Sequence, residues 1–261
     1  RCTKYASDHQ EKRGVLNSGE TLDIAQRLDN HVQVHRHQGA ASRVVSEGKR
    51  THGWLTLDDG ITGLGVAFRH MAEEYPKALE TTVGAEGITA YFWRDPDGKR
   101  LSLSRYAEEV AWHEGEGVYA DGTGLAKTSE CFVCYYEASQ QEEAIETLRT
   151  TLKPPHAAVD LAWMARCEAT GGFASYDPHA FPASERMMTG CADWMERNVH
   201  LGRWYSFLDW GDILAAWDEA DDDWQFRGRW GWCNSEWDPR HGLWIQYLRT
   251  GDPRYFQMGE A

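Results

Sequence analysis

Long hydrophobic runs, an excess of positive charge and repeated metal-ligand motifs are all missing from this sequence. No apolar run approaches the roughly 20 residues that a membrane-spanning helix needs, so no membrane partner is expected. Lysine and arginine number 27 against 41 acidic residues, which gives a net charge of −14. A protein that tracks nucleic-acid phosphates has the opposite balance, so no nucleic-acid partner is expected either.

Cysteine is also sparse, with six residues in 261. Cys131-Phe-Val-Cys134 is the single close pair, and no second pair of this spacing or nearby histidine pair accompanies it. A structural zinc site needs four converging ligands, so the sequence predicts no metal site here and favours buried free thiols, with disulfides left as an open alternative.

Neither an initiating methionine nor a signal peptide opens the sequence, which begins Arg1-Cys2-Thr3 and stops inside a predicted helix at Ala261. We therefore expect a piece of a longer protein, with little or no activity alone and with the remaining domains of its own chain as partners. Targeting information is missing on this interpretation, so an extracellular, periplasmic or cytoplasmic location stays open.

Residues 1–138 have the pattern of an antiparallel β domain. Runs of alternating polar and apolar residues are separated by turn-forming sequences such as Asp58-Asp-Gly60. The segment 65–80 is ambiguous, because its composition suits a helix whereas Tyr75-Pro76 favours extended backbone. Strands are expected at Val32–His35, Gly53–Leu57, Ile88–Trp93, Leu101–Leu103 and Glu130–Tyr136.

Residues 139–261 have helical patterns instead. Ser139-Gln-Gln-Glu142 predicts a capping box, and Pro154-Pro155 ends the helix that follows it. Further helices are expected over 157–170, 184–200 and 241–250. The helix over 184–200 has Met188, Cys191, Met195 and Val199 at helical spacing.

The sequence Thr250-Gly-Asp-Pro253 then predicts a tight αα-hairpin, with Gly251 after one helix and Asp252 capping the next. The expected fold is therefore α+β and multidomain. An antiparallel β-sandwich over 1–138 is followed over 139–261 by the first helices of an α/α toroid.

Most of the 13 tryptophans lie in the last third of the chain, interleaved with carboxylates, amides and guanidinium groups. Sugars need this mixture, because their C–H faces stack on aromatic rings and their hydroxyls need planar hydrogen-bonding side chains. A polysaccharide or oligosaccharide is thus the expected substrate.

Six short motifs are spread along the chain: Glu74-Tyr-Pro-Lys-Ala-Leu79, Tyr91-Phe-Trp93, Gly124-Leu-Ala-Lys-Thr-Ser-Glu130, Trp210-Gly-Asp212, Asn234-Ser-Glu236 and Tyr247-Leu-Arg-Thr-Gly-Asp252. Together they resemble exo-rhamnogalacturonan lyase and its bacterial relatives. The resemblance implies an N-terminal barrel, a central β-sandwich and a C-terminal α/α toroid. It also implies a polysaccharide lyase that acts on a uronate-containing, rhamnogalacturonan-like glycan, as in pectin degradation.

A lyase of this kind removes the C5 proton of a uronate by β-elimination, and a cation or amide must first neutralise the neighbouring carboxylate. On chemistry alone, Tyr205, His241 and Lys127 are the catalytic candidates. Each has a structural alternative: a core tyrosine, a helix-start histidine and a solvated lysine. Substrate contacts are predicted for Trp204, Trp210, Asp212, Arg229, Trp232, Asn234, Glu236 and Arg240, the rings and polar groups converging with the sheet on one sugar-sized hollow.

Two other functions fit the same residues. A glycoside hydrolase of the α/α-barrel type would use paired carboxylates from Asp209, Asp212, Glu236 and Asp238. A non-catalytic glycan-binding fragment would need only the rings and hydrogen-bonding groups. No cofactor is required, although Asp209 and Asp212 would suit calcium if they lie in a turn.

Overall fold

A computed structural model gives the positions of residues 2–7, 10–84, 87–94, 126–157, 159–167, 171–207, 210–211, 213, 216–225 and 238–261. Contacts divide the chain into two compact units. Unit 1 comprises Arg1–Leu101, Leu125–Pro155 and Tyr205–Leu208. Unit 2 comprises Ser102–Gly124, His156–Trp204 and Asp209–Ala261. None of the described helices is long and apolar enough to cross a bilayer.

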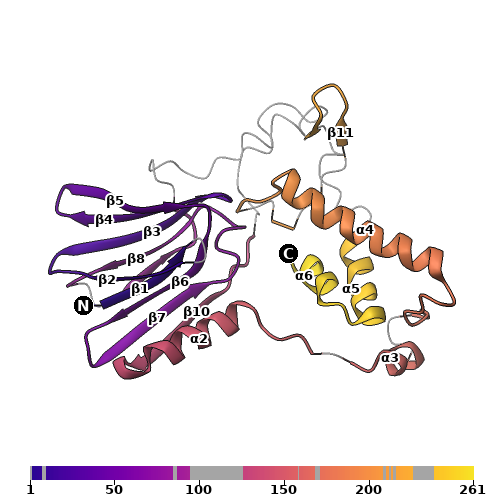
Figure 1. The fold of residues 1–261 in the computed structure, drawn as a ribbon, viewed down its shortest axis with the longest axis horizontal. Helices are drawn as coiled ribbons and strands as arrows, with labels where there is room; N and C mark the ends of the chain where they lie inside the picture. The colour runs from indigo at the N-terminus through magenta and orange to yellow at the C-terminus, as the bar shows by residue number, and fades with distance from the viewer. Residues whose placement is uncertain are drawn as a thin grey trace. The chain divides into compact units, whose positions relative to one another are not determined.

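Two antiparallel five-stranded sheets form the β part of unit 1 (Figure 1). The first has the strand order β10-β7-β6-β1-β2 and the second the order β5-β4-β3-β8-β9. Their strands are β1 (Cys2–Ser7), β2 (Gln10–Val15), β3 (Glu20–Leu28), β4 (His31–Gln38), β5 (Ala41–Gly48), β6 (Thr51–Asp58), β7 (Thr62–Phe68), β8 (Lys77–Thr82), β9 (Ile88–Tyr91) and β10 (Cys131–Glu137).

The two sheets pack face to face through a shared apolar core. Inward-facing residues of the first sheet meet those of the second, because successive side chains of a strand point to opposite faces. Ile24, Val34 and Leu79 of the second sheet and Leu55 of the first are completely buried in this core. The antiparallel β-sandwich predicted from the sequence is therefore present.

Helix α2 (Gln141–Leu152) covers the other face of the first sheet (Figure 1). Its Ile145 and Leu148 pack against Trp54 and Ala67, so both faces of this sheet are buried. The helix lies in the same compact unit as the strands. The domain boundary placed after residue 138 stays a prediction.

The start of α2 differs from the predicted capping box. A short 3₁₀ turn, η1 (Ala138–Gln140), precedes the helix, and its N-cap Gln140 makes no side-chain cap bond. The side chain of Gln141 instead donates to Asp58 Oδ2 at 2.9 Å. The first turn is thus fixed by this contact with β6, and the capping role of Ser139 was predicted wrongly.

Gly53 in β6 allows the last residue of β7 to approach this strand closely. Its φ is +79°, and a Cβ there would lie 2.6 Å from the carbonyl oxygen of Phe68. We expect Gly53→Ala to lower the free energy of unfolding by about 2 kcal/mol or more, because both the backbone angle and the contact become unfavourable. Urea denaturation followed by circular dichroism measures the loss.

Gly190 supplies the matched control for this prediction. It lies on a helix with open space around its Cα, so Gly190→Ala should leave the stability unchanged or raise it slightly. Equal losses for the two variants would contradict the close-approach argument.

Unit 2 contains α3 (Leu161–Cys167), α4 (Pro182–Leu201), α5 (Pro239–Thr250), α6 (Pro253–Glu260) and the hairpin β11 (Ala216–Asp218) and β12 (Asp223–Gln225). The αα-hairpin of α5 and α6 forms as predicted (Figure 1). Gly251 has a φ of 70° after α5, and the Asp252 side chain accepts a bond from the Arg254 N–H at the start of α6.

Two details of the helical prediction were wrong. Helix α3 begins at Leu161 rather than at 157, with the Asp160 side chain accepting a bond from the Trp163 N–H. On α4, Cys191 is exposed and the buried position is Ala192, which packs with Leu243 and Tyr255. Met188, Met195 and Val199 are half-buried, as the helical spacing predicts, so the error is confined to Cys191.

Candidate functional site

Three strand ends of the first sheet meet at one edge of unit 1. Antiparallel pairing places the start of β6 and the start of β10 beside the end of β7. The turn over residues 69–76 then leads into Lys77, the first residue of β8. Polar residues that flank these strands are consequently brought together, although they are far apart in the sequence.

Glu74 is the centre of the resulting cluster. Its Oε1 lies 3.0 Å from Lys127 Nζ, and its Oε2 accepts bonds from Lys77 Nζ and, at 3.3 Å, from Ser129 Oγ. Ser129 Oγ in turn accepts a bond from Lys77 Nζ at 3.1 Å. Two of the stretches that carry the family resemblance, 74–79 and 124–130, are thus joined by direct side-chain contacts.

The two lysines differ in their access to solvent. The Lys77 side chain is fully buried, whereas that of Lys127 is 20% exposed. Burial lowers the pKa of Lys77, while its bond to Glu74 acts in the opposite direction. Lys127 is therefore the ammonium that a solute can reach, and Lys77 holds Glu74 from behind.

Glu73, the residue before Glu74, pairs with a different cation. Its Oε1 accepts a bond from Arg50 Nη1 at 3.0 Å, and Arg50 also donates through Nε to the carbonyl oxygen of Asp29 at 2.9 Å. The Arg50 guanidinium lies over the ring of Tyr205, 4.9 Å from its centroid. The adjacent glutamates thus connect Tyr205 on one side with Lys127 on the other.

We call this set the two-glutamate network: Arg50, Glu73, Glu74, Lys77, Lys127, Ser129 and Tyr205. Beside it, Arg69 Nη1 pairs with Glu130 Oε2 at 2.8 Å. Together these groups provide four basic side chains against three acidic ones. An acidic chain thereby has a local site where negative charge is not in excess.

Tyr205 is 4% exposed, and burial raises the pKa of its hydroxyl. It therefore keeps its proton at neutral pH, which suits an acid and not a base. The same burial also fits the alternative of a core tyrosine. Lys127 lies before the start of β10, and its contact with Glu74 gives it a fixed partner.

The other described candidates belong to unit 2. His241 is exposed in the first turn of α5, where its backbone N–H donates to the N-cap Asp238. Arg240 and Trp210 are half-buried, and Trp204 is 3% exposed. Their catalytic and substrate-binding roles, and the groove predicted to be shared with the sheet, stay predictions.

Five predicted substrate contacts lie outside the described residues: Asp212, Arg229, Trp232, Asn234 and Glu236. Asp209, considered for a carboxylate pair or for calcium, lies outside them as well. Within the described part of the chain, no three histidine, cysteine, aspartate or glutamate side chains gather as a metal site would require. The described cysteines are free thiols.

The turn between β7 and β8 was not predicted from the sequence to contribute to the site. Glu73 and Glu74 were not chosen as site residues, and Arg50 and Ser129 were not considered. One signal was available, because Glu74 and Lys77 flank Pro76 within a stretch that also carried the family resemblance. The partners of that stretch are distant in the sequence, so only the fold shows them.

Comparison with known proteins supports the same family from the other end of the chain. Residues 154–261 match the family described as PcRGLX-like protein C-terminal alpha/alpha toroid domain. The chain is also similar to the uncharacterized protein YetA of Bacillus subtilis (strain 168), with 24% identity over 256 residues. That similarity covers 93% of this chain but 30% of YetA, so the chain spans about a third of its relative's length.

Proposed function

We propose that this chain is part of a polysaccharide lyase that cleaves a uronate-containing, rhamnogalacturonan-like glycan by β-elimination. The family match in residues 154–261 supports a carbohydrate-active protein. The two-glutamate network supports the finer assignment, because it joins two predicted catalytic residues, Lys127 and Tyr205, through the Glu73–Glu74 pair. That connection is the observation on which the proposal depends.

Lys127 is assigned to the uronate carboxylate. The C5 proton of a uronate is too weakly acidic to be removed until the charge of the carboxylate is neutralised. Lys127 is a partly exposed ammonium held 3.0 Å from Glu74, so its position is set before substrate arrives. A preorganised cation of this kind stabilises the developing enolate without having to reorganise.

Tyr205 is assigned as the acid that protonates the leaving oxygen. Because its hydroxyl keeps its proton, Tyr205→Phe should reduce turnover by about 10²-fold. The melting temperature should stay nearly unchanged, since the ring and its packing are retained. A variant that loses stability yet keeps its turnover would identify Tyr205 as a core residue.

His241 is assigned as the base that removes the C5 proton. Histidine is the side chain that most often transfers protons in enzymes, and an exposed ring can be reached by a substrate. Its side chain is exposed, so His241→Ala should leave the fold intact while turnover falls.

An ultraviolet absorbance assay tests the proposed reaction. β-Elimination leaves a C4–C5 double bond that absorbs, whereas hydrolysis produces reducing ends without it. The assay uses uronate glycans with this chain and with any longer protein that contains it. Reducing ends without absorbance would support the glycoside hydrolase, and binding without either signal would support a glycan-binding fragment.

A further inference from the structure

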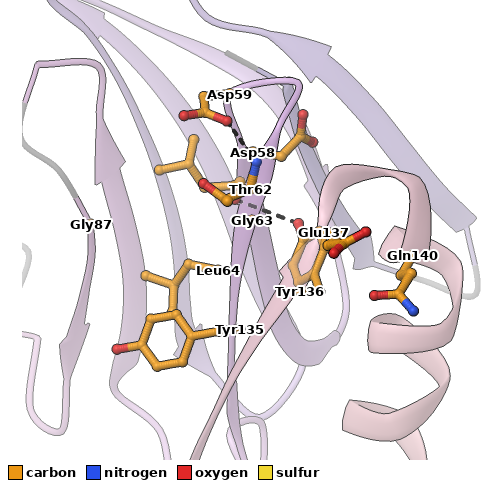
Figure 2. A pocket seen from close by; sticks show the side chains of 11 residues that line it. Asp58, Asp59, Thr62, Gly63, Leu64, Gly87, Tyr135, Tyr136, Glu137 and Gln140 are labelled. Atoms are coloured by element: carbon orange, nitrogen blue, oxygen red, sulfur yellow. Dashed lines mark hydrogen bonds between the residues drawn. The ribbon is translucent and has the colours of Figure 1, made fainter.

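A hollow lies at the end of the first sheet opposite to the two-glutamate network, where β6 ends, β7 begins and β10 ends. It has a volume of about 730 Å³, within the range of small-molecule sites. The two-glutamate network lies at the other end of these strands, so this hollow is separate from it. Its wall is drawn in Figure 2 and includes Asp58, Asp59, Thr62, Tyr135, Glu137 and Gln140.

The hairpin between β6 and β7 fixes the acidic side of the hollow. Asp59 Oδ1 accepts bonds from the backbone N–H groups of Ile61 and Thr62 at 2.9 and 2.8 Å. Asp58 accepts from the Gly60 N–H and from the Gln141 side chain. These carboxylates therefore have set positions, which a site for oriented hydroxyl groups needs.

The two neighbouring tyrosines of β10 have different environments. Tyr136 pairs with Gly63 and is 9% exposed, and its ring occupies the space where a side chain at Gly63 would be. Tyr135 pairs with Leu64, and 83% of its surface is exposed. In Figure 2 the Tyr135 ring stands beside Leu64 at the edge of the hollow. An open ring beside fixed acceptors is the combination that a sugar face and its hydroxyls require.

Charge decides which sugar fits. Among the described residues that line the hollow, Asp58, Asp59 and Glu137 carry carboxylates, and none is a lysine, arginine or histidine. Such a wall repels a uronate, whose carboxylate would find no cation there. Hydroxyl groups, by contrast, donate readily to carboxylate oxygens.

We propose that this hollow is a binding site for a neutral sugar residue, stacked on Tyr135 and held through its hydroxyls by the carboxylates. The hollow would bind a neutral sugar, whereas the two-glutamate network is proposed to bind a uronate. The proposal for the hollow does not depend on the proposed elimination.

Titration of the isotope-labelled 261-residue chain by nuclear magnetic resonance tests this site. The probes are D-galactose and L-rhamnose as neutral sugars, D-galacturonate as the acid and D-glucosamine as the amine. We expect the neutral sugars to shift the backbone amides of Thr62, Tyr135 and Glu137, and galacturonate to bind at least about tenfold more weakly. No shifts, equal binding of galacturonate, or binding of glucosamine alone would overturn the proposal.

Matched variants separate ring stacking from general effects. Tyr135→Ala should lower the affinity for the neutral sugars about tenfold. Tyr135→Phe should leave that affinity unchanged, because the ring is kept. Val133→Ala removes an exposed apolar side chain of the same strand outside the hollow and should change nothing. Glu137→Gln should raise the affinity for galacturonate, since it removes a negative charge that repels the sugar's carboxylate.

Lys127→Met distinguishes this site from the proposed active site. It should reduce the rate of elimination about 10³-fold and leave the amide shifts at Tyr135 unaltered. Equal affinity of Tyr135→Ala and the unsubstituted chain would end the proposal for the hollow without affecting the proposal for the lyase.

Discussion

Lys127→Met should reduce turnover by about 10³-fold, because the uronate carboxylate would lose the cation that faces it. The side chain is 20% exposed, and Glu74 keeps its second cation, Lys77. The free energy of unfolding should therefore change by about 1 kcal/mol or less. Initial rates of ultraviolet absorbance in a longer protein that contains this chain give the turnover, and urea denaturation of the chain itself gives the free energy of unfolding.

Two lysine variants make this test specific. Lys127→Arg keeps the positive charge and should recover part of the lost turnover. Lys153→Met removes an exposed lysine after α2 and should have no effect on either quantity. Full turnover of Lys127→Met would remove this residue from the mechanism and with it the main support for a lyase.

Lys77→Met should have the opposite profile, with a large loss of stability. The ammonium is completely buried and bonded to Glu74, whose side chain is 8% exposed. Glu74 would keep Lys127 at its Oε1, but its Oε2 would lose the buried ammonium, and removing one partner of a buried ion pair costs about 3 kcal/mol. Urea denaturation should show this loss, and the double variant Lys77→Met with Glu74→Gln should recover most of it. A double variant as unstable as the single one would show that the charge is not the cause.

The pH dependence gives an independent check on Lys77. Because burial lowers the pKa of Lys77 in the folded state, the folded chain releases this proton before the unfolded chain does. Between the lowered pKa and the ordinary value near 10.5, the unfolded state binds more protons. Stability from this group therefore increases as the pH rises through that window, and the Lys77→Met variant should lack the increase.

The sandwich and the helical hairpin were predictable because their signals are local. Alternation identified β4, β6 and β10, and the Thr250-Gly-Asp-Pro253 sequence fixed the turn between α5 and α6 within four residues. Helix starts were less predictable where tertiary contacts replace a cap. At the start of α2, the bond from Gln141 to Asp58 joins residues 83 positions apart, and no local pattern reports it.

The candidate site was only partly predictable for the same reason. Lys127 and Tyr205 were selected for their residue types, but the glutamates that connect them were not. Glu74 contacts Ser129 across 55 positions, and Arg50 contacts Glu73 across 23. Sequence reasoning also judged Tyr205 by its polar neighbours, whereas burial decides its protonation.

The segment between β7 and β8 carries adjacent carboxylates that serve different partners, Glu73 with Arg50 and Glu74 with the lysines. Inserting or deleting one residue before this pair would shift both carboxylates along the chain and away from the cations that each now contacts. The length of the segment is consequently a stricter requirement than its composition. We therefore expect related sequences to vary in residue type within this segment while keeping the same number of residues.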